Sequence, residues 1–435
     1  MKNAKRTLAL LLALVMSLSL LAGCGDQNGN TSGGNTASDT PLVVGYAPFS
    51  SKFSPFFSET AYDQDVWVMT QLGLLTSDRT GAIIYKGIEG ETIDYNGTDY
   101  TYYGPADLEV TENADGTVYY DFTLRDDLKF SDGEPLTIDD VIFSMYVLCD
   151  PTYEGNSTLY AQPIQGMEAY RSGMSARQNL ILAAGPDGYS ANDNYTEDQY
   201  NTFWAAFNAA GVKFAQEILD YCVAAGANEE SDSVAAKAAN WGFSLADDAT
   251  VEDFWAAIVE KYGYDLSDDG INAEKASSSI SELLTAELGD RAGEFSAGVQ
   301  TGESAANISG IQKTGDYSMR IVMTKVDAVA IYQLGVTIAP MHYYGDKSLY
   351  DYDNNSFGFP KGDLSSVRAK TTQPMGAGPY KFVKFENGTV YFEANESYFQ
   401  GAPKTKYVNF KECISDDDKL NGVTTGTIDI TDPSM

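Results

Sequence analysis

Alternation of apolar and polar residues predicts several β-strands in this chain. The alternating residues Val118, Tyr120, Phe122 and Leu124 predict a hairpin over 110–125, turned at Asp115-Gly116. A second hairpin is expected over 378–395, turned at Asn387-Gly388. Further strands are expected within 41–48, 318–324 and 406–413.

Apolar positions three and four residues apart predict helices. Thr137 is expected to cap a helix that ends before Pro151 and buries Val141, Ile142, Met145 and Leu148. Asp63 is expected to cap a helix that ends near Gly73, and Thr196 with Gln199 to open a long helix broken at Gly211. Two more helices are expected over 250–263 and 277–291.

Composition divides the chain into segments. Residues 155–307 are rich in Ala, Asp, Glu and Ser, which indicates an inserted helical subdomain. The alternative is a set of separate excursions packed on a larger core. The expected domains are 42–76 and 308–435 as two parts of one lobe, 77–154 as a β-rich subdomain, and 155–307 as the insertion.

The N-terminal segment has the residue pattern of a secretion signal. An apolar run over 7–23 follows Lys2, Lys5 and Arg6, and this pattern predicts a signal peptide over 1–23. Residues 24–41 lack large apolar side chains and are expected to form a flexible tether. Leu21-Ala22-Gly23-Cys24 resembles the lipobox of bacterial lipoproteins, which implies lipidation at Cys24. An ordinary signal peptide with a chance cysteine is the alternative.

Composition also limits the chemistry. A net charge of −34 argues against nucleic acid as a partner. Cys149, Cys222 and Cys413 form no metal-ligand spacing, so buried thiols are expected and a disulfide stays open. The single histidine, His342, is expected to be a structural hydrogen-bonding residue. We find no catalytic signature, no metal site and no cofactor motif.

Three stretches together resemble a known family. They are "FTLRDDLKFSDGEPLTIDDVIFSM", "MGAGPYKFVKFENG" and "NESYFQGAPKTKYVNFK" followed by "GTIDI", and "FSPFFSETAYDQDV" also fits. They resemble the family 5 extracellular solute-binding proteins, the peptide- and nickel-type receptors of ABC importers. The resemblance implies a mixed α/β fold, the first lobe of a type II (class C) periplasmic binding protein. It also implies a chain truncated before its second lobe.

The resemblance implies a function as well. We expect a monomeric, lipid-anchored receptor on the outer face of the cytoplasmic membrane, not an enzyme, that delivers an oligopeptide to ABC permease subunits. A receptor for a nickel chelate or sugar, or a surface lipoprotein that binds a partner protein through the helical insertion, is the alternative. The expected ligand-binding residues are Phe53, Ser54, Phe56, Leu159, Tyr160, Gly376 and Gly378.

Overall fold

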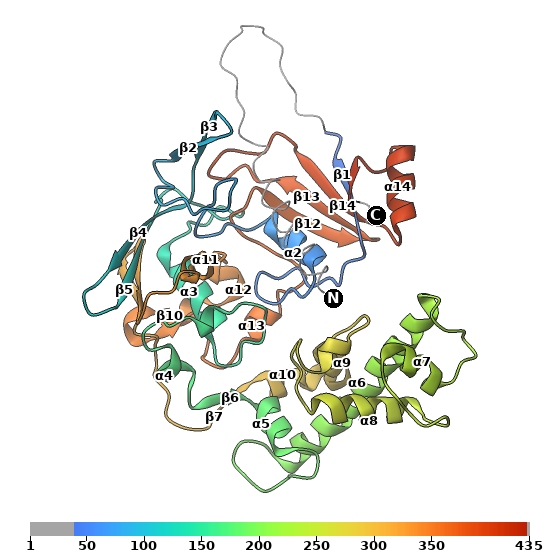
Figure 1. Cartoon of the computed structure of the whole chain (residues 1–435). Helices are drawn as coiled ribbons and strands as arrows, with labels where there is room; N and C mark the ends of the chain where they lie inside the picture. Colours follow the sequence, from blue (N-terminus) through green and yellow to red (C-terminus); the bar gives the residue numbers. More distant parts are fainter. Residues whose placement is uncertain (1–38, 433–435) are drawn as a thin grey trace. The chain divides into compact units, whose positions relative to one another are not determined.

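The computed structural model describes residues 39–432, so the segment predicted to be a signal peptide and Cys24 lie outside the described residues. The chain divides into two compact units (Figure 1). The first unit combines the segments before residue 173 and after residue 303, and the second is Gly173–Glu303. Residues 155–172 and 304–307 of the expected insertion lie in the first unit.

A five-stranded sheet organises one part of the first unit, with the strand order β12-β13-β14-β1-β15 (Figure 1). β1 is parallel to β14 and β15, whereas β12, β13 and β14 are antiparallel neighbours. The order leaves β12 at one edge. The strands are β1 Leu42–Tyr46, β12 Tyr380–Glu386, β13 Thr389–Ala394, β14 Tyr407–Glu412 and β15 Ile430–Thr431.

Helix α2, Ala61–Val68, packs on this sheet. Its Val66 is buried in a cluster with Phe53 and with side chains from the strands, including Phe392 and Phe410. The structure corrects both predicted ends of the helix. Thr60 is the N-cap, because its hydroxyl accepts the Asp63 N–H, and the helix ends at Val68 rather than near Gly73.

A second, antiparallel sheet has the order β4-β5-β9-β8. Its strands are β4 Ala106–Glu112, β5 Val118–Leu124, β8 Ile311–Gly315 and β9 Ser318–Met323. The predicted hairpin is confirmed, since β4 pairs with β5 and all four alternating residues of β5 are buried. β9 then extends the sheet from a distant part of the sequence.

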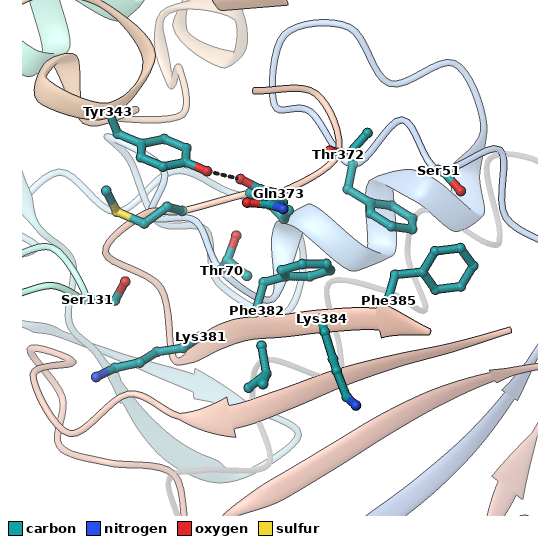
Figure 2. Close-up of a pocket in the computed structure, with 14 residues that line it drawn as sticks. Ser51, Thr70, Ser131, Tyr343, Thr372, Gln373, Lys381, Phe382, Lys384 and Phe385 are labelled. Atoms are coloured by element: carbon teal, nitrogen blue, oxygen red, sulfur yellow. Dashed lines mark hydrogen bonds between the residues drawn. The ribbon is translucent and has the colours of Figure 1, made fainter. Parts of the chain in front are cut away.

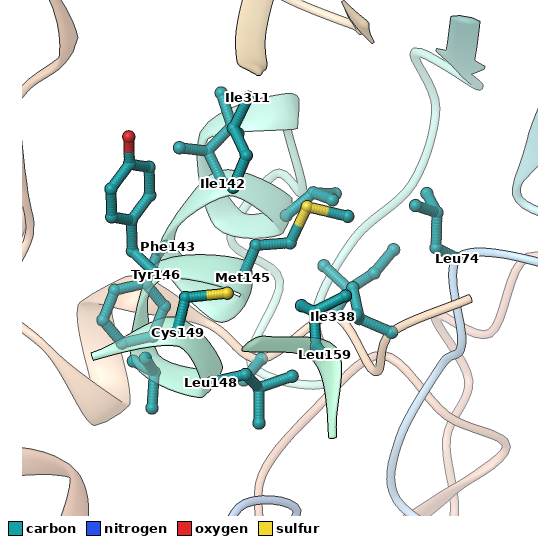
Figure 3. Packing of buried hydrophobic residues seen from close by; sticks show 14 of the residues in the cluster. Leu74, Ile142, Phe143, Met145, Tyr146, Leu148, Cys149, Leu159, Ile311 and Ile338 are labelled. Atoms are coloured by element: carbon teal, nitrogen blue, oxygen red, sulfur yellow. The ribbon is translucent and has the colours of Figure 1, made fainter. Parts of the chain in front are cut away.

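Helix α3, Ile138–Cys149, lies in the centre of the larger core of this unit (Figure 3). Thr137 caps it as predicted, and Asp140 completes a capping box by accepting the Thr137 N–H at 3.0 Å. The predicted apolar face is correct but too narrow, because every residue of α3 except Asp139 is buried. Neighbours from several distant segments, including Leu74, Ile311 and Ile338, surround it.

The three cysteines among the described residues are free and buried, as expected: Cys149 and Cys413 in the first unit and Cys222 in the second.

Short elements complete the first unit. The remaining elements are β2 Glu91–Tyr95, β3 Thr98–Tyr102, α4 Met167–Arg171, α11 Ala330–Leu334, α12 Met341–Tyr344, β10 Tyr350–Asp351, β11 Ser356–Phe357, α13 Ser365–Arg368 and α14 Asp416–Thr425.

The second unit is helical and has its own aromatic core. Its elements are β6 Met174–Ala176, α5 Arg177–Ala184, α6 Glu197–Ala224, α7 Val234–Trp241, α8 Val251–Tyr262, α9 Ile280–Leu288, α10 Ala292–Ser296 and β7 Gly298–Gln300. The capping box of Thr196 and Gln199 is confirmed. The predicted break at Gly211 is wrong, because α6 continues through it and the glycine admits the Trp255 indole.

Candidate ligand-binding site

A cavity of about 470 Å³ opens beside the edge strand β12 in the first unit (Figure 2). Five consecutive residues of β12 form one wall, and segments from five other parts of the chain form the rest. The lining residues are Ser51, Phe53, Thr70, Ser131, Tyr343, Thr372, Gln373, Pro374, Met375, Lys381, Phe382, Val383, Lys384 and Phe385.

Aromatic rings give the cavity an apolar side. Phe53 is fully buried, and its ring centroid lies 5.8 Å from that of Phe382 and 5.5 Å from that of Phe385. Figure 2 shows Phe382 and Phe385 leaving one side of β12, while Lys381 and Lys384 leave the other. Phe382 and Phe385 therefore face the core, whereas Lys381 and Lys384 lie on the opposite side of the strand.

Hydrogen bonds hold the polar parts of the cavity wall. The Tyr343 hydroxyl donates to the Gln373 carbonyl oxygen at 2.7 Å, and this bond ties α12 to the loop over 372–375. The Thr70 hydroxyl donates to the Trp67 carbonyl oxygen at 2.8 Å. Burial raises the pKa of Tyr343, so its hydroxyl stays neutral at physiological pH. The wall is thus positioned before a ligand arrives.

The charge of the cavity differs in sign from that of the chain. Two lysines and no carboxylate are among the described residues that line it, although the whole chain carries a net charge of −34. Lys384 forms an ion pair with Glu386, whereas the Lys381 side chain has no ion pair within residues 39–432. Lys381 therefore offers a positive charge at the cavity with which an anionic ligand group can pair.

The two predicted glycines lie behind the cavity wall. A Cβ atom on Gly376 would stand 2.5 Å from the Thr70 carbonyl oxygen, and one on Gly378 would stand 2.4 Å from the Thr70 carbonyl carbon. Their missing side chains let this loop pack against the end of the α2 segment. The Gly378 N–H donates to Thr70 O at 2.9 Å, and Ser131 N–H donates to Gly376 O at 2.9 Å.

The other predicted ligand-binding residues occupy different places. Phe53 lines the cavity. Ser54 is buried, and its hydroxyl accepts the N–H groups of Phe56 and Phe57. Phe56 and Leu159 are buried in the larger core, and Tyr160 packs against this core. The Arg171 guanidinium lies 4.3 Å from the centre of the Tyr160 ring. Of the seven, the structure brings only Phe53 to the cavity.

Sequence reasoning missed most of the lining residues. Tyr343 is far from Gln373 and Lys381 in sequence and meets them only in the folded unit. The hairpin signal at Asn387-Gly388 located β12, but that signal does not say which strand of a sheet is an edge. Strand order is a tertiary property, so these residues carried no local signal.

Two other site types were sought in the described residues. Residues 39–432 hold no cluster of three or more His, Cys, Asp or Glu side chains arranged for a metal ion. In the same range, no helix combines the length and apolar character that crossing a bilayer requires.

Comparison with known proteins gives one family match. The family described as "Bacterial extracellular solute-binding proteins, family 5 Middle" matches residues 102–220 and 243–434. A curated relative, the oligopeptide-binding protein AppA of Bacillus subtilis (strain 168), is 26% identical over 115 residues, which are 26% of this chain and 19% of AppA.

Solved structures also align with the chain. The structure of B. subtilis AppA in complex with a nonapeptide has a TM-score of 0.44 and 16% identity, covering 89% of this chain and 43% of that one. NikZ of Campylobacter jejuni in complex with Ni(L-His) has a TM-score of 0.39 and 14% identity, and the alignment covers 89% of this chain and 42% of NikZ. The Burkholderia pseudomallei OppA structure has a TM-score of 0.42 and 12% identity, and the alignment covers 91% of this chain and 46% of that OppA chain. The chain thus spans less than half of these solved relatives.

Proposed function

The chain belongs to the family 5 bacterial extracellular solute-binding proteins, and we propose that it captures an oligopeptide outside the cell for an ABC import permease. One observation carries the ligand proposal, namely the cavity beside β12. Its volume of about 470 Å³ lies within the range of small-ligand sites. It also combines aromatic rings with a few fixed polar groups, as such sites do.

Peptide is the ligand class that this lining suits. Phe53, Phe382 and Phe385 offer apolar surface for side chains of differing shape. Thr372, Gln373 and the β12 main chain offer groups that can bond to any peptide backbone. The curated relative AppA is named an oligopeptide-binding protein, which supports the same ligand class.

The rest of the proposal concerns the setting of the receptor. A lipid on Cys24 would hold the chain at the outer face of the cytoplasmic membrane as a monomer. The permease partner would hydrolyse ATP, so this chain would bind without catalysing a reaction. Cys24 lies outside the described residues, and the lipobox pattern alone supports this anchor.

Native mass spectrometry tests the ligand proposal. The full chain is purified from cells grown in rich medium and sprayed under non-denaturing conditions. A series of bound masses that match short peptides is expected. A single non-peptide mass, such as a sugar or a metal chelate, would overturn the peptide proposal.

A further inference from the structure

Residues 47–54 follow β1 as a loop, and this loop contributes to the cavity wall. Ser51 and Phe53 of the loop line the cavity (Figure 2). Phe53 is fully buried among the rings of the wall. The loop itself contains no helix or strand. The shape of this part of the wall therefore depends on the contacts that fix the main chain of the loop.

The carboxylate of Asp63 makes two of these contacts. Its Oδ1 atom accepts the Ser50 N–H at 3.1 Å, and its Oδ2 atom accepts the Lys52 N–H at 3.0 Å. Asp63 lies in the first turn of α2 and is fully buried. The two hydrogen bonds tie the loop to the helix on both sides of Ser51.

Ser51 has a backbone conformation that it would not adopt by itself. Its φ is 63°, in the left-handed region that residues with a Cβ atom seldom occupy. The other non-glycine residues with positive φ in the described part of the chain are asparagines, which tolerate this region better. Such a conformation persists only where its surroundings impose it. The hydrogen bonds to Asp63 on either side of Ser51 supply that constraint.

The loop also explains why an aspartate stands at position 63. The N–H of Asp63 serves the helix, since it donates to the Thr60 hydroxyl at 3.1 Å, and any residue but proline could supply this group. Burial raises the pKa of Asp63, although the N–H groups of Lys52 and Ser50 and the Lys52 charge favour its ionised form. The carboxylate is thus kept in an unfavourable environment, and its oxygens contact the loop.

We propose that Asp63 is a positioning residue of the cavity, because its carboxylate holds residues 50–52 in the conformation that places Ser51 and Phe53 in the wall. The effect on affinity rests on the proposed function, whereas the hold on the loop does not. Without the carboxylate, Ser51 leaves the left-handed region and the binding-competent fraction of the protein falls. The apparent Kd rises in inverse proportion to that fraction.

Asp63→Asn tests the effect on affinity. An amide has one acceptor oxygen where the carboxylate has two, so it cannot hold both N–H groups. The probe is the pentapeptide Ala-Glu-Val-Glu-Ala, and calorimetry measures its affinity for the full chain. The affinity should fall about tenfold, as expected if about a tenth of the molecules keep the competent loop.

A second substitution separates positioning from a general loss of stability. Adding Ser51→Gly to Asp63→Asn should bring the affinity back to within about threefold of wild type, because glycine adopts positive φ readily. A general loss of stability would not be repaired in this way, since glycine also makes the unfolded chain more flexible. Absence of this recovery would overturn the positioning role.

Asp150→Asn is the matched control. Asp150 is equally buried, and its two oxygens accept the N–H groups of Thr152 and Gly362 at 2.8 Å each. None of these residues lines the cavity. Asp150→Asn should lower stability and leave the peptide affinity unchanged. A loss of affinity equal to that of Asp63→Asn would show that any lost buried carboxylate weakens binding and would overturn the proposal.

Hydrogen exchange of the wild-type protein decides the hold on the loop even if Asp63→Asn does not fold. The Ser50 and Lys52 amides should exchange slowly although they lie in a loop, and exchange at the rate of a free chain would overturn the proposal. An unchanged affinity in Asp63→Asn would overturn the positioning role and leave peptide capture standing. Failure of the wild type to bind the pentapeptide would instead overturn the proposed function, and the exchange rates would still decide whether Asp63 holds the loop.

Discussion

The Nε2 atom of His342 lies 2.7 Å from the Oδ2 atom of Asp132, so the chain's only histidine joins α12 to the turn after β5. The imidazole N–H donates to the carboxylate, and the ring packs edge-on against Phe130 at 5.5 Å. The prediction that His342 forms a hydrogen bond within the fold is confirmed. The pair holds Ser131, next to Asp132, in the cavity wall.

This pair should make stability depend on pH in the acidic range. Burial opposes ionisation of Asp132, but hydrogen bonds from His342 and the Glu134 N–H outweigh it and lower the pKa of Asp132. Because the folded pKa is below the unfolded value of about 3.9, the stabilisation is present above that value and is lost as the pH falls through the folded pKa.

Asp132→Asn removes this contribution. The variant should be less stable than wild type by up to about 1 kcal/mol at pH 7, as expected for a partly exposed pair. The difference in unfolding free energy between wild type and the variant should shrink as the pH approaches 3. Urea unfolding from pH 3 to 7 measures this difference. A difference that stays constant over this range would contradict the stabilising role of the ionised Asp132.

Asp140 should show the opposite dependence. Burial raises the pKa of Asp140 to about 6, although the N–H groups of Thr137 and Met341 favour its charged form. A folded pKa above the unfolded one gives most stability at low pH, and this contribution falls as the pH rises through about 6. The stability advantage of wild type over Asp140→Asn should therefore shrink between pH 4 and 7. Urea unfolding measures it, and an advantage that grows with pH would reject the assignment.

Gly211 of α6 should not tolerate a side chain. A Cβ atom there would lie 1.9 Å from Cε2 of Trp255, so Gly211→Ala should destabilise the second unit by about 1–3 kcal/mol. Gly293→Ala in α10 is the matched control, since nothing lies within 4 Å of its Cβ position. It should raise stability by up to about 1 kcal/mol. Thermal unfolding compares them, and equal effects would refute the packing explanation.

The cavity can be filled from its rim. Thr372 lines the cavity and is exposed, so Thr372→Trp should occupy ligand space without disturbing the core. Peptide affinity should fall at least about tenfold, which corresponds to about 1.4 kcal/mol. Thr371→Trp is the control, because Thr371 is the preceding residue and does not line the cavity. Calorimetry with Ala-Glu-Val-Glu-Ala measures both, and similar affinities would place the ligand elsewhere.

Elements set by neighbouring residues could be predicted from the sequence. The capping box of α6 needs only Thr196 and Gln199, and the turn of the second hairpin needs only Asn387 and Gly388. Gly211 was misread because its propensity to break a helix is local, whereas its packing partner Trp255 lies far along the chain. Packing against the Trp255 ring, rather than helix propensity, explains why a glycine stands at position 211 of α6.

The residues that line the cavity also divide into those that could be predicted from the sequence and those that could not. Phe53 could be named because it follows the first strand, a place where binding loops are common. Tyr343, Gln373 and Lys381 could not, because their meeting depends on strand order and on the loop over 372–375. Neither property leaves a periodic signal in the sequence.

Photo-cross-linking tests the central claim most directly. Ala-Glu-Val-Glu-Ala with a diazirine in its central side chain is irradiated with the full chain, and the labelled segments are mapped by mass spectrometry. The account predicts label within 372–375 and 381–385 that excess unlabelled peptide removes. Label confined to 173–303, the helical unit, would contradict capture beside β12 and would favour a partner-binding insertion.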